Sequence, residues 1–175
     1  MPKRLLAIIL IVLGFLIFTP LASAQTSPLT ETYTNTSNGQ VIVHVIMKAK
    51  TADDAAAMVK LANQSWLNMT FKGMTIARTD PFVPELLKAW KADRGTSFEG
   101  TFDSRPSTDL CTACPSLLLL VQRGTTVHLF VLISTRGPLG GAEVQPFADY
   151  AGKAILSGKP GVDPPDGFTA LDTSS

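Results

Sequence analysis

Two cysteines stand three positions apart, in the sequence Cys111-Thr112-Ala113-Cys114-Pro115. This C-x-x-C spacing is that of thiol–disulfide oxidoreductases, in which the first thiol has a lowered pKa. Those enzymes place the motif after a strand and at a helix N-terminus, where the helix dipole stabilises the thiolate. Here an apolar, strand-like segment follows the motif instead. We therefore expect a disulfide between Cys111 and Cys114 that staples a loop, with redox activity, an intermolecular bond or a metal role as alternatives.

The chain has two histidines, His44 and His128, and each stands in the middle of an apolar segment. If their strands are adjacent, the two rings could share one face and line a pocket, or titrate together as a pH-sensitive pair. Buried sheet histidines with satisfied hydrogen bonds are the commoner situation. Together with the two cysteines they reach the four ligands of a zinc site, but their spacing matches no zinc finger. We expect no metal and no other cofactor.

Other catalytic signatures are missing from the sequence. It contains no G-x-S-x-G nucleophile motif, no G-x-G-x-x-G and no Walker sequence. Those motifs hold a nucleophile or cradle phosphates in most hydrolases and nucleotide-binding enzymes. We therefore predict no catalytic residues.

Residues 1–24 have the pattern of a secretory signal peptide. Lys3 and Arg4 give a positive start, Leu5–Phe18 is apolar, and an A-x-A sequence ends at residue 24. The apolar stretch is shorter than the roughly 20 residues that a membrane-spanning helix needs. We expect cleavage, with an uncleaved anchor as the alternative. The protein would then be secreted or extracytoplasmic, with no stable membrane insertion.

Removal of Lys3 and Arg4 with this peptide leaves 13 basic against 14 acidic side chains, a net charge of −1. No basic cluster remains, so we expect no nucleic-acid partner. The remaining length suits one domain. We place a leader and first strand at 25–39 and a single domain at 40–157. Residues 158–175, rich in Pro, Gly and Asp, are expected to be a disordered tail.

The segment Ser116–Ser134 predicts a β-hairpin. Two apolar runs meet at Arg123–Thr126, where Gly124 supplies the positive φ that a tight turn needs. Both faces of each run are apolar, so both faces must be covered. We expect helices at Ala52–Trp66 and Val144–Leu156 to cover one face. The other face would meet the second helix, a partner chain or an apolar ligand.

Helix and strand signals flank this hairpin. Thr51 has N-cap chemistry, and Pro81 or Pro84 suits the start of a second, short helix. Strands are expected at Thr30–Thr36, Val41–Met47, 68–78 and Thr96–Phe102, the first two joined by a type I′ turn at Asn38-Gly39. The order predicts an α+β fold: a mostly antiparallel sheet with two or three helices packed on it, around the central hairpin at 116–134.

Three pieces of the sequence carry a resemblance to a known family. They are an apolar strand followed by a T-A-x-D-A helix ending in Trp (Val41–Trp66), a Q-R-G-x-x-V hairpin (Gln122–Val127), and a terminal helix centred on Asp149-Tyr150-Ala151. Together they resemble the extracytoplasmic sensor domains of bacterial Ser/Thr kinases and related secreted proteins and lipoproteins. The chain departs from that pattern, in which a Cys usually stands close behind the Trp: Trp66 is followed by Leu67-Asn68-Met69, and both cysteines lie together at 111 and 114. The resemblance implies an α+β sandwich with a cleft for an unidentified ligand, and no catalytic residues.

The functional hypothesis is an exported, non-catalytic ligand-binding or sensing module, with a small apolar ligand or a protein as partner. One alternative is an extracytoplasmic thiol–disulfide protein acting through Cys111 and Cys114. Another is a structural protein that forms a homodimer through a sheet face or edge. The side chains expected to bind the ligand or form the interface are His44, Trp66, Trp90, His128, Phe130 and Leu132.

Overall fold

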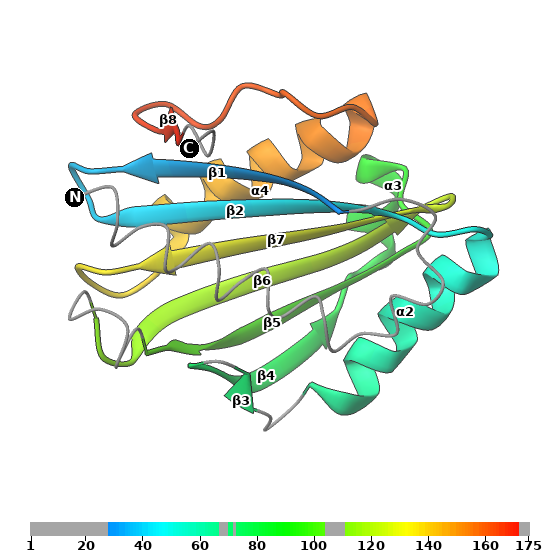
Figure 1. The fold of residues 1–175 in the computed structure, drawn as a ribbon, viewed down its shortest axis with the longest axis horizontal. Coiled ribbons are helices and arrows are strands. Elements are labelled where there is room, and N and C mark those ends of the chain that lie inside the picture. Colours follow the sequence, from blue (N-terminus) through cyan, green and yellow to red (C-terminus); the bar gives the residue numbers. More distant parts are fainter. Residues whose placement is uncertain (1–27, 67–69, 72, 104–110, 172–175) are drawn as a thin grey trace.

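The computed structural model of the 175-residue chain describes residues 28–66, 70–71, 73–103 and 111–171, so the expected signal peptide lies outside the described residues. The described strands form one antiparallel sheet in the order β3-β4-β5-β6-β7-β2-β1-β8 (Figure 1). The strands are β1 (Leu29–Asn35), β2 (Gln40–Lys48), β3 (Thr70–Phe71), β4 (Met74–Pro81), β5 (Arg94–Phe102), β6 (Cys114–Arg123), β7 (Thr126–Ser134) and β8 (Thr169–Ala170). The helices of the described residues are α2 (Ala52–Ser65), α3 (Pro84–Trp90) and α4 (Gly141–Ser157). This confirms the predicted α+β fold, a mostly antiparallel sheet with two or three helices packed on it, of which the described residues contain three.

The predicted hairpin is β6 and β7, at the centre of the sheet. Its register pairs Arg123 with Thr126, and Gly124 has a φ of +58°, as a tight turn requires. Side-chain hydrogen bonds hold the tip of this hairpin. The side-chain amide of Gln122 donates to the carbonyls of Ala52 and Gly124, and Arg123 Nη1 donates to the carbonyl of Leu156 at the end of α4.

The β1–β2 connection differs from the predicted two-residue turn at Asn38-Gly39. The loop is residues 36–39, and β2 begins opposite Asn35, which pairs with Gln40. The Asn35 side chain explains the longer loop, because its Oδ1 accepts hydrogen bonds from the Ser37 and Asn38 amides at 3.1 and 3.4 Å. The register consequently shifts by two residues, which preserves the faces of the strands but changes which residues lie opposite each other.

The helices cover both faces of the sheet. Helix α2, capped by Thr51, which accepts a hydrogen bond from the Asp54 amide, contacts β5, β6 and β7 on one face. Helices α3 and α4 lie on the other (Figure 1). We refer to these as the α2 face and the α4 face. The expectation that Ala52–Trp66 and Val144–Leu156 cover the same face is wrong. Each has an apolar stripe that either face of the hairpin could satisfy, since both faces are apolar.

Strand alternation divides the buried side chains into two cores. On β7, Val127, Leu129, Val131 and Ile133 belong to the core of the α2 face. Phe130 and Leu132 belong to the core of the α4 face, together with Phe147, Tyr150 and Ala151 of α4. A sheet buried on both faces needs near-continuous apolar strands, and β6 and β7 provide them.

Residues 158–171, which we call the strap, run along the outer edge of β1. β8 pairs with Tyr33 and Thr34 of β1, and the Leu171 amide donates to the Thr32 carbonyl at 2.8 Å. Val162 and Phe168 are partly buried against the core of the α4 face. The structure therefore differs from the expected disordered tail over 158–171: two apolar side chains and a few backbone hydrogen bonds order a Pro- and Gly-rich segment.

Candidate functional site

Four of the predicted site residues lie together on the α4 face. β2 and β7 are adjacent, and their register pairs His44 with Phe130 and Ile46 with His128. Because side chains alternate along a strand, His44, His128, Phe130 and Leu132 all point to the same side. All four are almost completely buried.

The two tryptophans lie on opposite faces. Trp90 packs in the core of the α4 face, with its ring centroid 5.3 Å from that of Phe82. Trp66 is buried on the α2 face, 5.2 Å from Phe98 between ring centroids. The sheet therefore separates Trp66 from the other predicted residues.

A line of hydrogen bonds crosses β1, β2 and β7 on the α4 face. His44 Nδ1 lies 3.1 Å from Glu31 Oε2, and His44 Nε2 lies 3.1 Å from His128 Nδ1. At the outer end, Glu31 Oε1 accepts a hydrogen bond from the Gly161 amide of the strap at 2.5 Å. We call Glu31, His44 and His128 the histidine chain.

The carboxylate assigns the tautomers in this chain. Ionised Glu31 can only accept, so His44 carries its proton on Nδ1. His44 Nε2 then accepts, and His128 must donate from Nδ1. This leaves Nε2 of His128 as an unprotonated acceptor. His128 borders a pocket of about 200 Å³ at the end of α4, also lined by Arg123, Thr126, Ile155, Ser157 and Gly158.

The environment keeps both imidazoles neutral at neutral pH. Burial lowers the pKa of His44, and the neighbouring Glu31 carboxylate opposes this only in part. Burial, followed by the charges of His44 and Arg123, lowers the pKa of His128 to about 3. Burial alone would raise the pKa of Glu31, but hydrogen bonds from His44 and Gly161 lower it overall. The histidine chain therefore titrates in acid rather than near neutrality.

Aromatic rings pack around His44 and hold it in place. Its ring stacks on Phe130, with centroids 4.1 Å apart and an interplanar angle of 12°. Tyr150 Oη of α4 lies 3.3 Å from His44 Nδ1, and the Tyr150 ring meets Tyr33 edge-on at 5.6 Å. Both ring nitrogens of His44 have partners and the residue is fully buried, so His44 is a structural part of the core.

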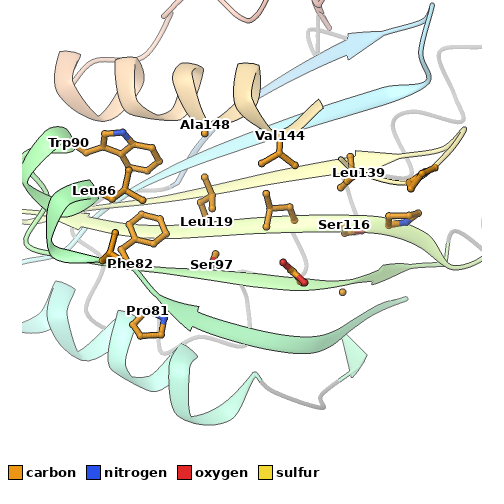
Figure 2. Close-up of a pocket in the computed structure, with 16 residues that line it drawn as sticks. Pro81, Phe82, Leu86, Trp90, Ser97, Ser116, Leu119, Leu139, Val144 and Ala148 are labelled. Atoms are coloured by element: carbon orange, nitrogen blue, oxygen red, sulfur yellow. The ribbon is translucent and has the colours of Figure 1, made fainter. Parts of the chain in front are cut away.

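An open groove of about 640 Å³ lies on the same face, between α3 and α4 (Figure 2). Its floor is formed by β5 and β6, one wall by the segment from Pro81 to Trp90, and the opposite wall by α4 and the loop before it. The lining side chains are mostly apolar. They are Pro81, Phe82, Val83, Leu86, Trp90, Ser97, Glu99, Pro115, Ser116, Leu117, Leu119, Pro138, Leu139, Val144 and Ala148, with Gly100 in the floor.

Two glycines give the groove its α3 wall. A Cβ on Gly95 would collide with the ring of Phe82, so the missing side chain lets this ring lie against β5. A Cβ on Gly152 would lie 2.7 Å from Nε1 of Trp90, so a bare glycine on α4 lets the indole pack against that helix. The aromatic wall depends on both close approaches.

No family model matches the chain, and no curated protein matches it. The solved structures that it resembles include the extracellular domain of PknH from Mycobacterium tuberculosis, with a TM-score of 0.43 and 11% sequence identity over 69% of this chain and 56% of that domain. They also include PA94 from Pseudomonas aeruginosa, a protein of unknown function described as a candidate regulator, with a TM-score of 0.38 and 11% identity over 81% of this chain and 88% of that one.

The first of these structures is the extracellular domain of a mycobacterial Ser/Thr kinase. It confirms the resemblance to such domains that the sequence indicates, and this resemblance is weak. The match spans little more than half of that domain. At these scores the similarity carries no argument about function. A function has to be inferred from the groove and the histidine chain instead.

Cys111 and Cys114 form a disulfide. Cys114 is buried in the core of the α2 face, begins β6 and is followed by Pro115 of the groove. The motif therefore precedes a strand, and it lacks the helix N-terminus that stabilises a thiolate in thioredoxin-like enzymes. A structural staple at the start of β6 is the role that this position supports.

Within the described ranges, no group of three or more His, Cys, Asp or Glu side chains is placed to hold a metal ion. Cys114 lies on the α2 face and the two histidines lie on the α4 face, so the sheet separates the ligands that a zinc site would have combined. No helix of the described part of the chain is long and apolar enough to span a membrane.

Sequence reasoning missed Glu31, Tyr150 and most of the groove. A signal for Glu31 was present, because alternation along β1 allows an acid on the face of His44. The two-residue turn predicted at Asn38-Gly39 would have placed Tyr33 opposite His44, whereas the observed register places Glu31 there. The groove had no local signal, since it depends on the gap that α3 and α4 leave between them.

Proposed function

We propose that the chain is an exported, non-catalytic binding module that takes a small, predominantly apolar ligand in the groove between α3 and α4. The groove is the observation that carries this proposal. Its volume of about 640 Å³ lies within the range of roughly 300–1,000 Å³ that ligand sites occupy. Its lining joins apolar walls to a few polar groups, which is the usual composition of such sites.

One feature of the sequence and one of the structure support export. The first 24 residues have the signal-peptide pattern, and the two cysteines are joined in a disulfide, which persists in oxidising compartments. The absence of catalytic motifs from the sequence favours binding over catalysis. The predicted residues contribute unequally: Trp90 lines the groove, whereas His44, Phe130 and Leu132 form the packed core of the same face.

The test is native mass spectrometry of the protein purified from its own host. A co-purifying small molecule is expected on the wild type. Ala148→Trp places a large ring in the groove and should abolish the adduct (Figure 2). Ala142→Trp, an exposed position in the first turn of α4 that does not line the groove, is the matched control and should retain it. A wild type without any bound molecule contradicts the proposal.

A further inference from the structure

The polar side chains that line the groove present mainly hydrogen-bond acceptors to a ligand. The hydroxyl of Ser97 donates to the Asp80 carbonyl at 3.3 Å, and that of Ser116 donates to the Cys114 carbonyl at 3.1 Å. Each hydroxyl has one proton to give, so both are left with acceptor lone pairs alone. The third polar side chain of the lining, Glu99, is a carboxylate.

The groove is also poor in backbone and ring donors. Pro81, Pro115 and Pro138 line it and have no N–H. The floor strands β5 and β6 pair with each other along their whole shared length. Backbone N–H groups that bond within this ladder are not free to donate to a ligand. The Trp90 indole nitrogen is turned toward Gly152 on α4. An anionic ligand would find little here to bind its charge.

Glu99 has no ion-pair partner among the described residues. Arg78 lies opposite it in the β4–β5 ladder, but Arg78 Nε is 2.6 Å from Asp80 Oδ2, so its charge is matched on its own strand. In the described part of the chain Glu99 makes no side-chain hydrogen bond or ion pair. It is the one charged side chain among the groove residues. The faces of Phe82 and Trp90 add a surface that favours cations.

We propose that the ligand of the groove is a cationic amphiphile: a protonated amine that binds Glu99 and the serine lone pairs, attached to an apolar body that packs between Phe82 and Val144. This inference rests on the proposed function, because it names the chemical class of the ligand of the same groove. Charge complementarity and the shortage of donors select the amine. The apolar walls select the body.

Three probes with the same ten-carbon chain test it: decylammonium, decanol and decanoate, titrated calorimetrically below the concentration at which they form micelles. Decylammonium should bind tightest and decanoate weakest. Glu99→Gln should weaken decylammonium by about fivefold, the upper value for an exposed ion pair, and leave decanol unchanged. Glu85→Gln removes an exposed carboxylate of α3 that does not line the groove, and should change neither.

The outcomes separate the two proposals. Equal binding of decylammonium and decanoate, or an equal effect of Glu99→Gln and Glu85→Gln, overturns the cationic ligand and leaves a neutral apolar ligand in the groove. Failure of all three probes to bind overturns the proposed function as well. Binding that survives Ala148→Trp places the probes outside the groove and contradicts both. A circular dichroism spectrum matching the wild type confirms that each variant is folded.

Discussion

His44 and His128, 84 residues apart, share a hydrogen bond of 3.1 Å between Nε2 and Nδ1. The bond fixes the register of β2 against β7, because a slip of one residue would turn His44 into the apolar core of the α2 face without a partner. Glu31 extends the same constraint to β1. The histidine chain thus specifies how three strands of a largely apolar sheet align.

Acid should destabilise the protein through this chain. The pKa of His128 is about 3 when folded and near 6.5 when unfolded, so the unfolded chain binds more protons between these values. Stability is therefore lost as the pH falls through that window. Glu31, whose folded pKa is lowered from 4.5, acts in the same direction below that value. Urea midpoints measured from about pH 7 to about pH 4 should fall steadily.

His128→Asn is the matched variant for this prediction. An asparagine amide can donate near the position of Nδ1, but it does not titrate. We expect a lower urea midpoint at neutral pH because the packing on Phe130 is reduced, together with a flatter dependence on pH. Parallel pH profiles for the two proteins would show that His128 does not cause the acid sensitivity.

Glu31 should hold the strap on the sheet edge. Glu31→Gln replaces a charged acceptor of the Gly161 amide by a neutral one, which weakens the hydrogen bond by ~1.4 kcal/mol. Hydrogen exchange at Gly161 should then accelerate by about tenfold. Glu99→Gln, an exposed carboxylate on β5, provides the comparison. Unchanged exchange at Gly161 would mean that β8 and Phe168 alone hold the strap.

The disulfide should matter for stability and not for binding. Cys111 and Cys114 close a very short loop, with a sequence separation of 3, and the chain-entropy estimate for such a loop is about 2 kcal/mol. Cys111→Ser/Cys114→Ser should lose up to that amount in urea unfolding and keep its ligand in native mass spectrometry. A folded variant that loses its biological activity while keeping the ligand would favour the thiol–disulfide alternative.

The elements that local chemistry specifies could be predicted from the sequence. Gly124 in a short polar turn between two apolar runs identifies the central hairpin, and Thr51 before a helical apolar stripe identifies the start of α2. The face that each helix covers could not be predicted, because the hairpin is apolar on both sides. The strap was missed because Val162 and Phe168 are isolated apolar residues in a polar segment, and their burial depends on α4 and β1.

In the candidate site, too, the features that local sequence specifies could be predicted and those that depend on tertiary packing could not. The shared face of His44 and His128 was an expectation from alternation, conditional on adjacent strands, and the structure supplies the adjacency. Glu31 depended on the length of the β1–β2 loop, which the Asn35 side chain decides. The groove is a tertiary feature: residues from β5, β6, α3 and α4 meet there, and no sequence period marks a gap between two helices.

Gly152 should be a position where a helix-favouring substitution destabilises the protein. Alanine in a helix interior is normally better than glycine by ~1 kcal/mol. Here the new Cβ would lie 2.7 Å from Trp90 Nε1, in a closely packed contact between α4 and the residue that ends α3. Overpacking of this kind costs about 1–3 kcal/mol. Gly152→Ala should therefore lower the urea midpoint, and it should weaken ligand binding because Trp90 must shift into the groove.

Trp90→Phe separates the two contributions to the effect of Gly152→Ala, the contact with the indole and the helix propensity of alanine. The smaller ring removes the indole nitrogen that the new Cβ would meet, so Gly152→Ala should be neutral or stabilising in the Trp90→Phe background. The double-mutant cycle should then give a coupling free energy of about 1 kcal/mol or more, as for residues in direct contact. Additive effects would mean that the indole moves without cost, and the aromatic wall of the groove would not depend on Gly152.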